Sequence, residues 1–297
     1  MKANQKPILN SDLIGDYVSI ELPGFAGKKQ KPEPCRVHYL SMGKGEPLLL
    51  VPPVGQSIYT FRKLMPLLAR SYCTIAIDLP GSGYSDRPYS LNYSMKEMAD
   101  ILVQCLDALE IQRTHALGVT MGAEYLMLAA AEHPDRFMKV VALTPGGMTE
   151  QMPKKLRRLE RPLGFLYREL YNKKDFAKYL PLFYYDETVC TGEVVEQVYK
   201  TLDSFASRQA LMYAIRNFDE EYAIAEIQKR EREFFIIWGD ADRLQPMDRL
   251  FQLRELLPKS IYHSIRNSGH WLHEEKAAAI AEAADRYIRY EGEPQYD

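Results

Sequence analysis

The chain has 297 residues, of which 46% are hydrophobic and 26% charged, which is enough apolar material for one large domain or a domain with a substantial insertion. A formal net charge of −2 gives no general attraction to nucleic acid or to an anionic membrane, so neither is expected as a partner. Four scattered cysteines without a Cys-x-x-Cys pair, and an N-terminus without the apolar run of a signal peptide, favour a soluble cytoplasmic protein with no membrane span.

Strand-like and helix-like segments alternate along the first half of the chain. In chain order the patterns predict strands at 17–22 and 35–43, a short buried strand within 46–55 that Pro52-Pro53 ends, and a helix at 58–72. A strand and then a Gly-rich turn follow within 73–85, and after them a helix at 94–111, a strand at 115–119, a helix after Thr120 and a strand at 139–145. The second of these helices opens with the capping-box pattern Ser94-x-x-Glu97. Buried strands that alternate with helices predict a mostly parallel sheet covered by helices on both faces.

The alternation stops between about Met148 and Arg230, where the sequence is polar, aromatic-rich and helical, with no strand-like run. Two strand patterns follow, one within 233–246 and one within 260–271, and residues 275–290 form a closing amphipathic helix. A loop of about eighty residues without secondary structure would be implausible inside a compact domain. The sequence therefore predicts a core domain of residues 1–147 and 229–297, interrupted by a helical cap of residues 148–228.

Residues 114–137 read as a buried strand, an abrupt turn with the pattern Gly118-x-Thr120-x-Gly122, and an apolar helix. Acyl transfer needs a nucleophile, a base that takes its proton, an acid that orients the base, and N–H donors for the oxyanion. Open α/β sheets place their sites at the carboxyl ends of the strands. Candidates occur there in the order nucleophile, acid and base: Thr120, Asp242 and His270.

These segments, with others, resemble the α/β-hydrolase superfamily, of the single-chain type with a helical cap. "DLPGSGYSD" resembles the turn after the family's fourth strand, and "AAEHPDRFMKVVAL" resembles the link to its sixth. "WGDADRLQP" matches the pattern Trp-Gly-x-x-Asp-x-x-x-Pro, and "NSGHWLHEEKAAAI" matches the family's Gly-His segment. The resemblance spans nearly the whole chain outside the cap. It implies the α/β-hydrolase fold, a mostly parallel central sheet flanked by helices with an inserted helical cap.

The resemblance also implies a role for each candidate residue. Thr120 would stand in the place of the usual nucleophilic serine, Asp242 would be the triad acid and His270 the base. The oxyanion would be bound by the backbone N–H groups of Val54 and Met121. Chemistry of this kind needs neither a cofactor nor a metal, and we expect none.

Other residues compete for these roles. Asp240 lies two positions before Asp242 and is the alternative acid, although the motif register favours Asp242. Asp78 with its neighbouring glycines is expected to shape a turn rather than to act in catalysis. The remaining histidines lack metal-ligand spacing and are read as strand, helix or loop positions without a partner: His38, His115, His133, His263 and His273.

Two departures from the family pattern affect the expected chemistry. Threonine keeps the attacking hydroxyl, but a β-branched residue adds strain in the nucleophile turn, and its methyl group occupies space beside the oxygen. With Thr120 in this place we expect a slow enzyme, because an error of about 1 Å in the position of the attacking oxygen can cost two orders of magnitude in rate. Pro52-Pro53 replaces the common His-Gly after the third strand, and the donor expected from that loop is the next residue, Val54.

The function predicted is hydrolysis of a small ester, thioester or related acyl compound, with the cap segments 165–172 and 179–187 as an apolar and aromatic roof that selects the substrate. One alternative is a relative of impaired catalysis that binds a ligand or regulates. Retention of both Asp242 and His270 argues against it, because binding alone needs neither. A third interpretation keeps catalysis but changes the reaction to acyl transfer or carbon–carbon bond cleavage. Substrate and oligomeric state are not encoded in any pattern of the sequence.

Overall fold

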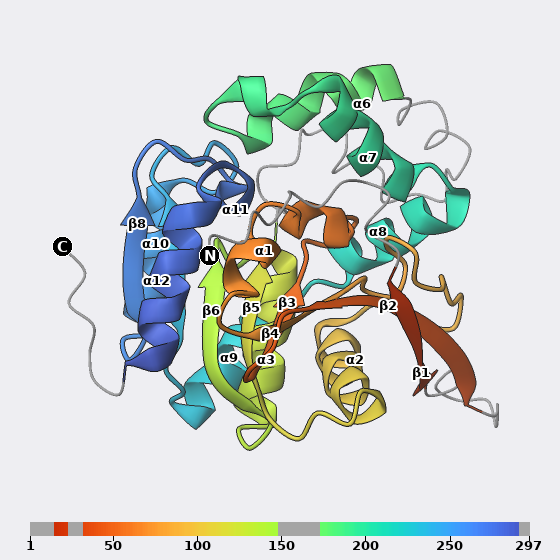
Figure 1. Cartoon of the computed structure of the whole chain (residues 1–297), viewed down its shortest axis with the longest axis horizontal. Helices are drawn as coiled ribbons and strands as arrows, with labels where there is room; N and C mark the ends of the chain where they lie inside the picture. Colours follow the sequence, from red (N-terminus) through yellow and green to blue (C-terminus); the bar gives the residue numbers. More distant parts are fainter. Residues whose placement is uncertain (1–14, 23–31, 148–172, 291–297) are drawn as a thin grey trace, which may run out of the picture.

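The computed structural model describes residues 15–22, 32–147 and 173–290. Within them an eight-stranded sheet has the order β1-β2-β4-β3-β5-β6-β7-β8 (Figure 1). β1 pairs antiparallel with β2, and β2 pairs antiparallel with β4, while all other neighbours are parallel. The strands span Asp16–Leu22 (β1), Glu33–Met42 (β2), Pro47–Val51 (β3), Cys73–Ile77 (β4), Thr114–Val119 (β5), Phe137–Leu143 (β6), Phe235–Gly239 (β7) and Ile261–Ile265 (β8).

Helices cover both faces of the sheet, as the alternating pattern predicts. α2 (Met95–Ala108), α3 (Met121–Glu132) and α9 (Glu220–Arg230) bury their apolar side chains against one face. α1 (Met65–Leu68) and α12 (Ala277–Arg289) pack on the other. The remaining elements of the core are η2 (Ile58–Phe61), α10 (Met247–Leu256) and α11 (Leu272–Glu275). The predicted fold class, a mostly parallel sheet flanked by helices, is confirmed.

The helix predicted over 58–72 is not continuous. η2 ends at Phe61, and α1 begins only at Met65, with Pro66 in its first turn. Proline has no N–H to donate within a helix, and its ring clashes with the carbonyl four residues before it. A helix cannot run unbroken through Pro66, so two short helices replace the predicted long one. The capping box of α2 is present as predicted, since Ser94 N–H donates to Glu97 Oε2 at 3.0 Å.

Residues 173–230 are helical and, within this described range, contribute no strand to the sheet. Figure 1 shows α6 and α7 gathered at one end of the sheet, apart from the helices that flank it. α9 differs from them, because it packs lengthwise on α3 of the core. Of the two cap segments expected to roof the substrate, 165–172 lies outside the described residues. Between β6 and β7, the described residues from 173 onward form α6 (Lys173–Tyr179), η3 (Leu180–Phe183), η4 (Glu187–Val189), α7 (Gly192–Leu202), α8 (Phe205–Arg216) and α9.

None of the helices in the described ranges is both long enough and apolar enough to cross a membrane.

Candidate active site

Thr120 occupies a sharp turn between β5 and α3. Its backbone has φ 51° and ψ −124°, a region that β-branched residues rarely adopt, so the strain expected of this turn is present. The glycines on either side permit close packing. A side chain at Gly118 would meet the Ala123 backbone at 2.5 Å, and one at Gly122 would meet the Pro52 carbonyl oxygen at 2.1 Å. The Gly-x-Thr-x-Gly pattern is therefore a steric requirement of the turn.

Asp242 and His270 form a buried pair. Asp242 Oδ2 lies 2.8 Å from His270 Nδ1, and neither side chain is exposed. Asp242 Oδ1 accepts the backbone N–H groups of Leu244 and Gln245, each at 2.8 Å. A carboxylate only accepts hydrogen bonds, so Nδ1 is the nitrogen that donates, and in the neutral ring the lone pair lies on Nε2. The alternative acid Asp240 is exposed and makes no contact with the ring in the described structure.

Lateral contacts bring Thr120 and His270 to the same edge of the sheet. Thr120 N–H donates to Leu143 O at 2.9 Å, and Thr144, the next residue, donates its hydroxyl to His270 O at 3.2 Å. The roles expected of Thr120 and His270 would call for a hydrogen bond between the threonine hydroxyl and His270 Nε2, and the described structure does not contain it. His270 Nε2 is buried and has no hydrogen-bond partner among the described residues. In unliganded sites such bonds are often long or misaligned and tighten when substrate binds.

The backbone donors expected at the site lie on a turn and at a helix start. Val54 is the second residue of a turn closed by Gln56 N–H donating to Pro53 O at 3.0 Å. The third residue, Gly55, has φ +80°, which a type II turn requires and which favours glycine. Met121 is the first residue of α3, and the first N–H groups of a helix have no acceptor inside it. Both N–H groups are thus on elements suited to binding an oxyanion.

A buried polar network lies next to the Asp242–His270 pair, on the side of η2. Glu274, four residues after His270, is fully buried and accepts hydrogen bonds from Arg62 (2.8 Å), Thr60 (2.8 Å) and Tyr184 (3.0 Å). Burial by itself would raise the pKa of Glu274, but the charge and hydrogen bond of Arg62 outweigh it and lower that pKa. The sequence analysis did not predict this network. The local pattern that could have indicated it is the run of ionisable residues His273-Glu274-Glu275 shortly after His270.

The insertion contacts the histidine loop through η3. The Phe183 ring lies 5.8 Å from the His270 ring, centroid to centroid, and Phe183 O accepts the Trp271 N–H at 2.9 Å. Leu180 and Tyr184 form a small apolar cluster with Trp271. Part of the segment 179–187, which the sequence analysis expects to roof the site, therefore packs against the loop that carries His270.

Several other histidines have partners, contrary to the sequence-based expectation. His38 pairs with Asp78 at 2.8 Å, and Asp78 also accepts the N–H groups of Ile58 and Tyr84, which gives that aspartate the expected turn-shaping role. His115 lies 3.4 Å from Glu46. These partners come from distant strands and loops, so no local pattern reveals them.

In the described ranges, Asp100, Glu132 and His133 lie close enough together to hold a metal ion. Lys96 forms ion pairs with Asp100 and with Glu132, so a cation already occupies that position.

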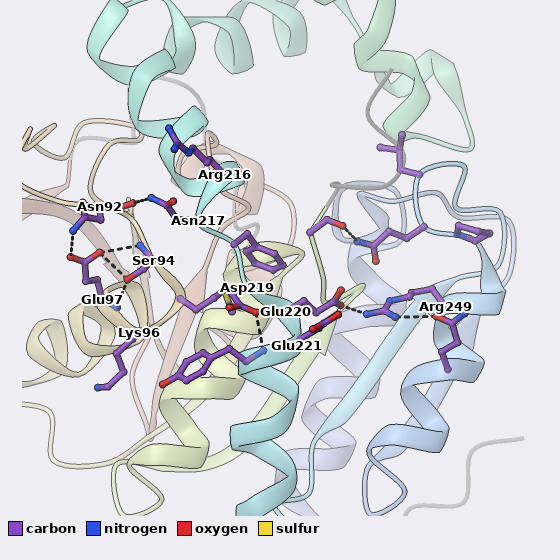
Figure 2. A pocket seen from close by; sticks show the side chains of 18 of the residues that line it. Asn92, Ser94, Lys96, Glu97, Arg216, Asn217, Asp219, Glu220, Glu221 and Arg249 are labelled. Carbon is purple, nitrogen blue, oxygen red and sulfur yellow. Dashed lines mark hydrogen bonds and ion pairs between the residues drawn. The ribbon is translucent and has the colours of Figure 1, made fainter. Parts of the chain in front are cut away.

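Two cavities lie beside the site. The larger, about 1160 Å³, is lined by the starts of α2, α9 and α10, and Figure 2 shows Glu97, Glu220 and Arg249 around it. It reaches Leu244 and Gln245, next to Asp242. The smaller, about 310 Å³, lies between the Ser57–Tyr59 segment and Thr201 of α7. Thr120, Asp242 and His270 line neither of them.

Comparisons with known proteins agree with this architecture. The family model described as alpha/beta hydrolase fold matches residues 46–189. A 2-hydroxy-6-oxononadienedioate/2-hydroxy-6-oxononatrienedioate hydrolase of Pseudomonas putida is 31% identical over 274 residues, covering 85% of this chain and 91% of its own length. The uncharacterized hydrolase YugF of Bacillus subtilis is 27% identical over 254 residues, covering 85% and 93%.

Among solved structures, a 2-hydroxy-6-oxo-6-phenylhexa-2,4-dienoate hydrolase from Rhodococcus sp. strain RHA1 superposes with a TM-score of 0.73 at 19% identity, covering 93% of this chain and all of its own. At that identity the likeness concerns the fold alone. The chain belongs to the α/β-hydrolase family. Its relatives in this comparison are named hydrolases, which supports hydrolase activity here.

Proposed function

We propose that the chain is a hydrolase of small esters, thioesters or related acyl compounds, which uses Thr120 as nucleophile, His270 as base and Asp242 as the acid that orients the base. The observation that carries this proposal is the buried Asp242–His270 pair with its unpartnered Nε2. A buried imidazole held in this tautomer has its basic nitrogen free for a proton, and binding alone does not need such a nitrogen.

In the proposed reaction the Thr120 hydroxyl attacks the substrate carbonyl carbon, and its proton passes to His270 Nε2. The Val54 and Met121 N–H groups stabilise the oxyanion of the tetrahedral intermediate. The leaving group takes the proton from His270 as its bond to the carbonyl carbon breaks. Water then attacks the acyl-threonine ester, again through His270, and releases the acid and free Thr120.

We further propose that residues 148–228 act as a cap over a core of residues 1–147 and 229–297. Support comes from the packing of Phe183 and Tyr184 on the His270 loop, through which the insertion would close the site. Aromatic side chains in that position would exclude water and select the acyl or alcohol part of the substrate.

A second candidate is hydrolysis of a carbon–carbon bond next to a ketone. Relatives at 25% to 31% identity are named as hydrolases of 2-hydroxy-6-oxo-dienoates. Such a reaction also passes through attack on a carbonyl, so the same residues would serve it.

A substrate panel tests both candidates. Purified protein would be assayed on short-chain p-nitrophenyl esters, acyl thioesters and 2-hydroxy-6-oxo-dienoates, with Asp242→Asn as the matched variant. We expect turnover of at least one class, and a loss on the order of 10³–10⁴ in kcat for Asp242→Asn, because the asparagine amide favours the wrong imidazole tautomer. Equal activity of the two proteins would remove the pair from the mechanism. Inactivity across the panel would favour the ligand-binding alternative.

A further inference from the structure

The turn that carries Val54 is held by three side chains from two separate parts of the chain. Ser82, in the turn after β4, accepts the Gly55 N–H at 3.1 Å. Asp78 Oδ1 accepts the N–H of Ile58 at 2.7 Å, just beyond the turn. The third contact comes from the insertion: Thr201 Oγ1, on α7, lies 2.6 Å from Gly55 O.

The Thr201 hydroxyl lies within hydrogen-bond distance of Gly55 and of a carbonyl of its own helix. It has one proton and lies near two carbonyl oxygens, Gly55 O at 2.6 Å and Val198 O at 2.7 Å. Val198 O is inside α7 and is the regular acceptor for the N–H four residues later. The Gly55 carbonyl belongs to a turn and has no helical donor. Thr201 is 6% exposed, so water does not readily replace its hydroxyl.

Apolar side chains of the insertion reinforce the contact. An added Cβ at Gly55 would lie 3.4 Å from Leu202 Cδ2 of α7 and 3.2 Å from Leu211 Cδ1 of α8. Leu202 of α7 and Leu211 of α8 therefore lie against Gly55, the residue after Val54. Because Gly55 has φ +80°, a larger residue is disfavoured there both by backbone conformation and by space.

We propose that Thr201 is a positioning residue for the oxyanion donor, so that the Val54 N–H takes its productive orientation only when α7 is docked on the core. This inference rests on the proposed function, in which Val54 binds the oxyanion. Ser82 fixes the N–H end of Gly55 and Thr201 fixes its C=O end, so the two bonds together prevent the turn from rotating. The insertion would thereby not only select the substrate but also hold the Val54 N–H in place for the oxyanion.

Loss of the Thr201 bond should act on the transition state more than on substrate binding. An oxyanion donor matters only as negative charge develops, and a displacement of about 1 Å can cost about a hundredfold in rate. For a turn still held by Ser82 and Asp78 we expect a smaller loss, on the order of tenfold in kcat, with KM changed by less than about threefold.

Thr201→Val tests this, because valine keeps the shape and removes the hydroxyl. Thr201→Ser is the conservative variant and should restore most of the wild-type kcat. Thr191→Val is the matched control: Thr191 caps the start of the same helix through Val194 N–H at 3.3 Å and is not part of the contacts to Gly55. It should loosen only the first turn of α7, far from Thr201, and leave the bond to Gly55 in place, so we expect no comparable effect on kcat. Amide hydrogen exchange of Gly55 and Gln56 provides a readout independent of activity and should be faster in Thr201→Val than in wild type.

A tenfold fall in kcat for Thr201→Val, rescued by serine and accompanied by faster exchange, supports the inference. An unchanged kcat in an active enzyme overturns it, and so does an equal fall in Thr191→Val, which would trace the effect to α7 stability. If the wild-type protein is inactive on the whole panel, the proposed function fails, and exchange alone decides whether Thr201 holds the turn. Unchanged exchange in that case overturns the inference as well.

Discussion

The backbone N–H of Gly269 donates to the Glu275 carboxylate, with 2.7 Å between the nitrogen and Oε2. The other oxygen of the same carboxylate accepts the N–H groups of Tyr185 and Asp186, at 2.9 and 2.8 Å. One side chain thus ties the loop that carries His270 to the turn after η3 in the insertion. Space is also limited at this junction, because a side chain at Gly269 would meet Tyr185 N at 2.7 Å.

Glu275→Gln should lower the free energy of unfolding by about 1–3 kcal/mol, because the charge-assisted hydrogen bonds are lost. In addition, the NH₂ group of the glutamine amide would face backbone N–H donors and could not accept from them. Glu282→Gln is the matched control, since Glu282 is an exposed residue paired with Arg286 on α12. We expect it to change stability by less than about 0.5 kcal/mol. Urea unfolding of the three proteins measures the difference, and equal midpoints for Glu275→Gln and wild type would contradict the role assigned to this carboxylate.

Thr120→Ala should abolish activity, because the attacking hydroxyl is removed. Thr120→Ser keeps the hydroxyl and relieves the strain of a β-branched residue at φ 51°. We expect it to raise kcat/KM about tenfold, a change of about 1.4 kcal/mol in the barrier. Steady-state kinetics on the best substrate of the panel measures both variants. A serine variant of equal or lower activity would mean that the pocket is built around the threonine methyl group. Undiminished activity of Thr120→Ala would exclude Thr120 as nucleophile.

We expect His273 to make the folded protein less stable in acid. Burial lowers the pKa of His273 from 6.5 to about 4, and of the neighbouring charges Glu274 raises it while Arg62, His270 and Lys63 lower it. Between about pH 6.5 and pH 4, His273 is therefore protonated in the unfolded chain but not in the folded protein. Stability should fall as the pH drops through this window, by up to about 3 kcal/mol from this group, since one pKa unit corresponds to about 1.4 kcal/mol.

His273→Gln should flatten that part of the curve. Unfolding free energies of both proteins between pH 4 and pH 8 measure the slope. An identical slope for the variant and the wild type would show that His273 does not account for the loss.

Glu124 should lower the stability of the protein as the pH rises, which is the opposite of the effect expected for His273. Burial, and secondly the charge of Glu220, raise the pKa of Glu124 well above 4.5, while Arg249 lowers it. The folded state holds a proton that the unfolded chain releases above pH 4.5, so stability is full below that pH and is lost as the pH rises toward the folded pKa. Glu124→Gln cannot ionise, and its stability relative to wild type should increase with pH. Thermal unfolding from pH 4 to pH 9 checks this, and a constant difference in midpoint would contradict it.

Local patterns in the sequence predict a large part of this structure. The strands were located because buried parallel strands are short continuous apolar runs, and α2 because Ser94 and Glu97 form a capping box. The sharp turn at Thr120 was recognisable because glycines at fixed spacing on both sides of it, Gly118 and Gly122, are a steric necessity. The long helix predicted over 58–72 was wrong, since amphipathic spacing outweighed the proline that interrupts it.

The sequence by itself determined the order of Thr120, Asp242 and His270 and their places at strand ends, because each lies in a short motif whose geometry is local. Only the tertiary structure decided how these residues are supported. Thr201 reaches Gly55 across 146 positions, and Glu275 reaches Tyr185 across 90. A side chain that bonds to a backbone group leaves no pattern at the other end, because every residue carries a carbonyl and nearly every one an N–H. Such contacts are defined only when the chain has folded and brought the two segments together.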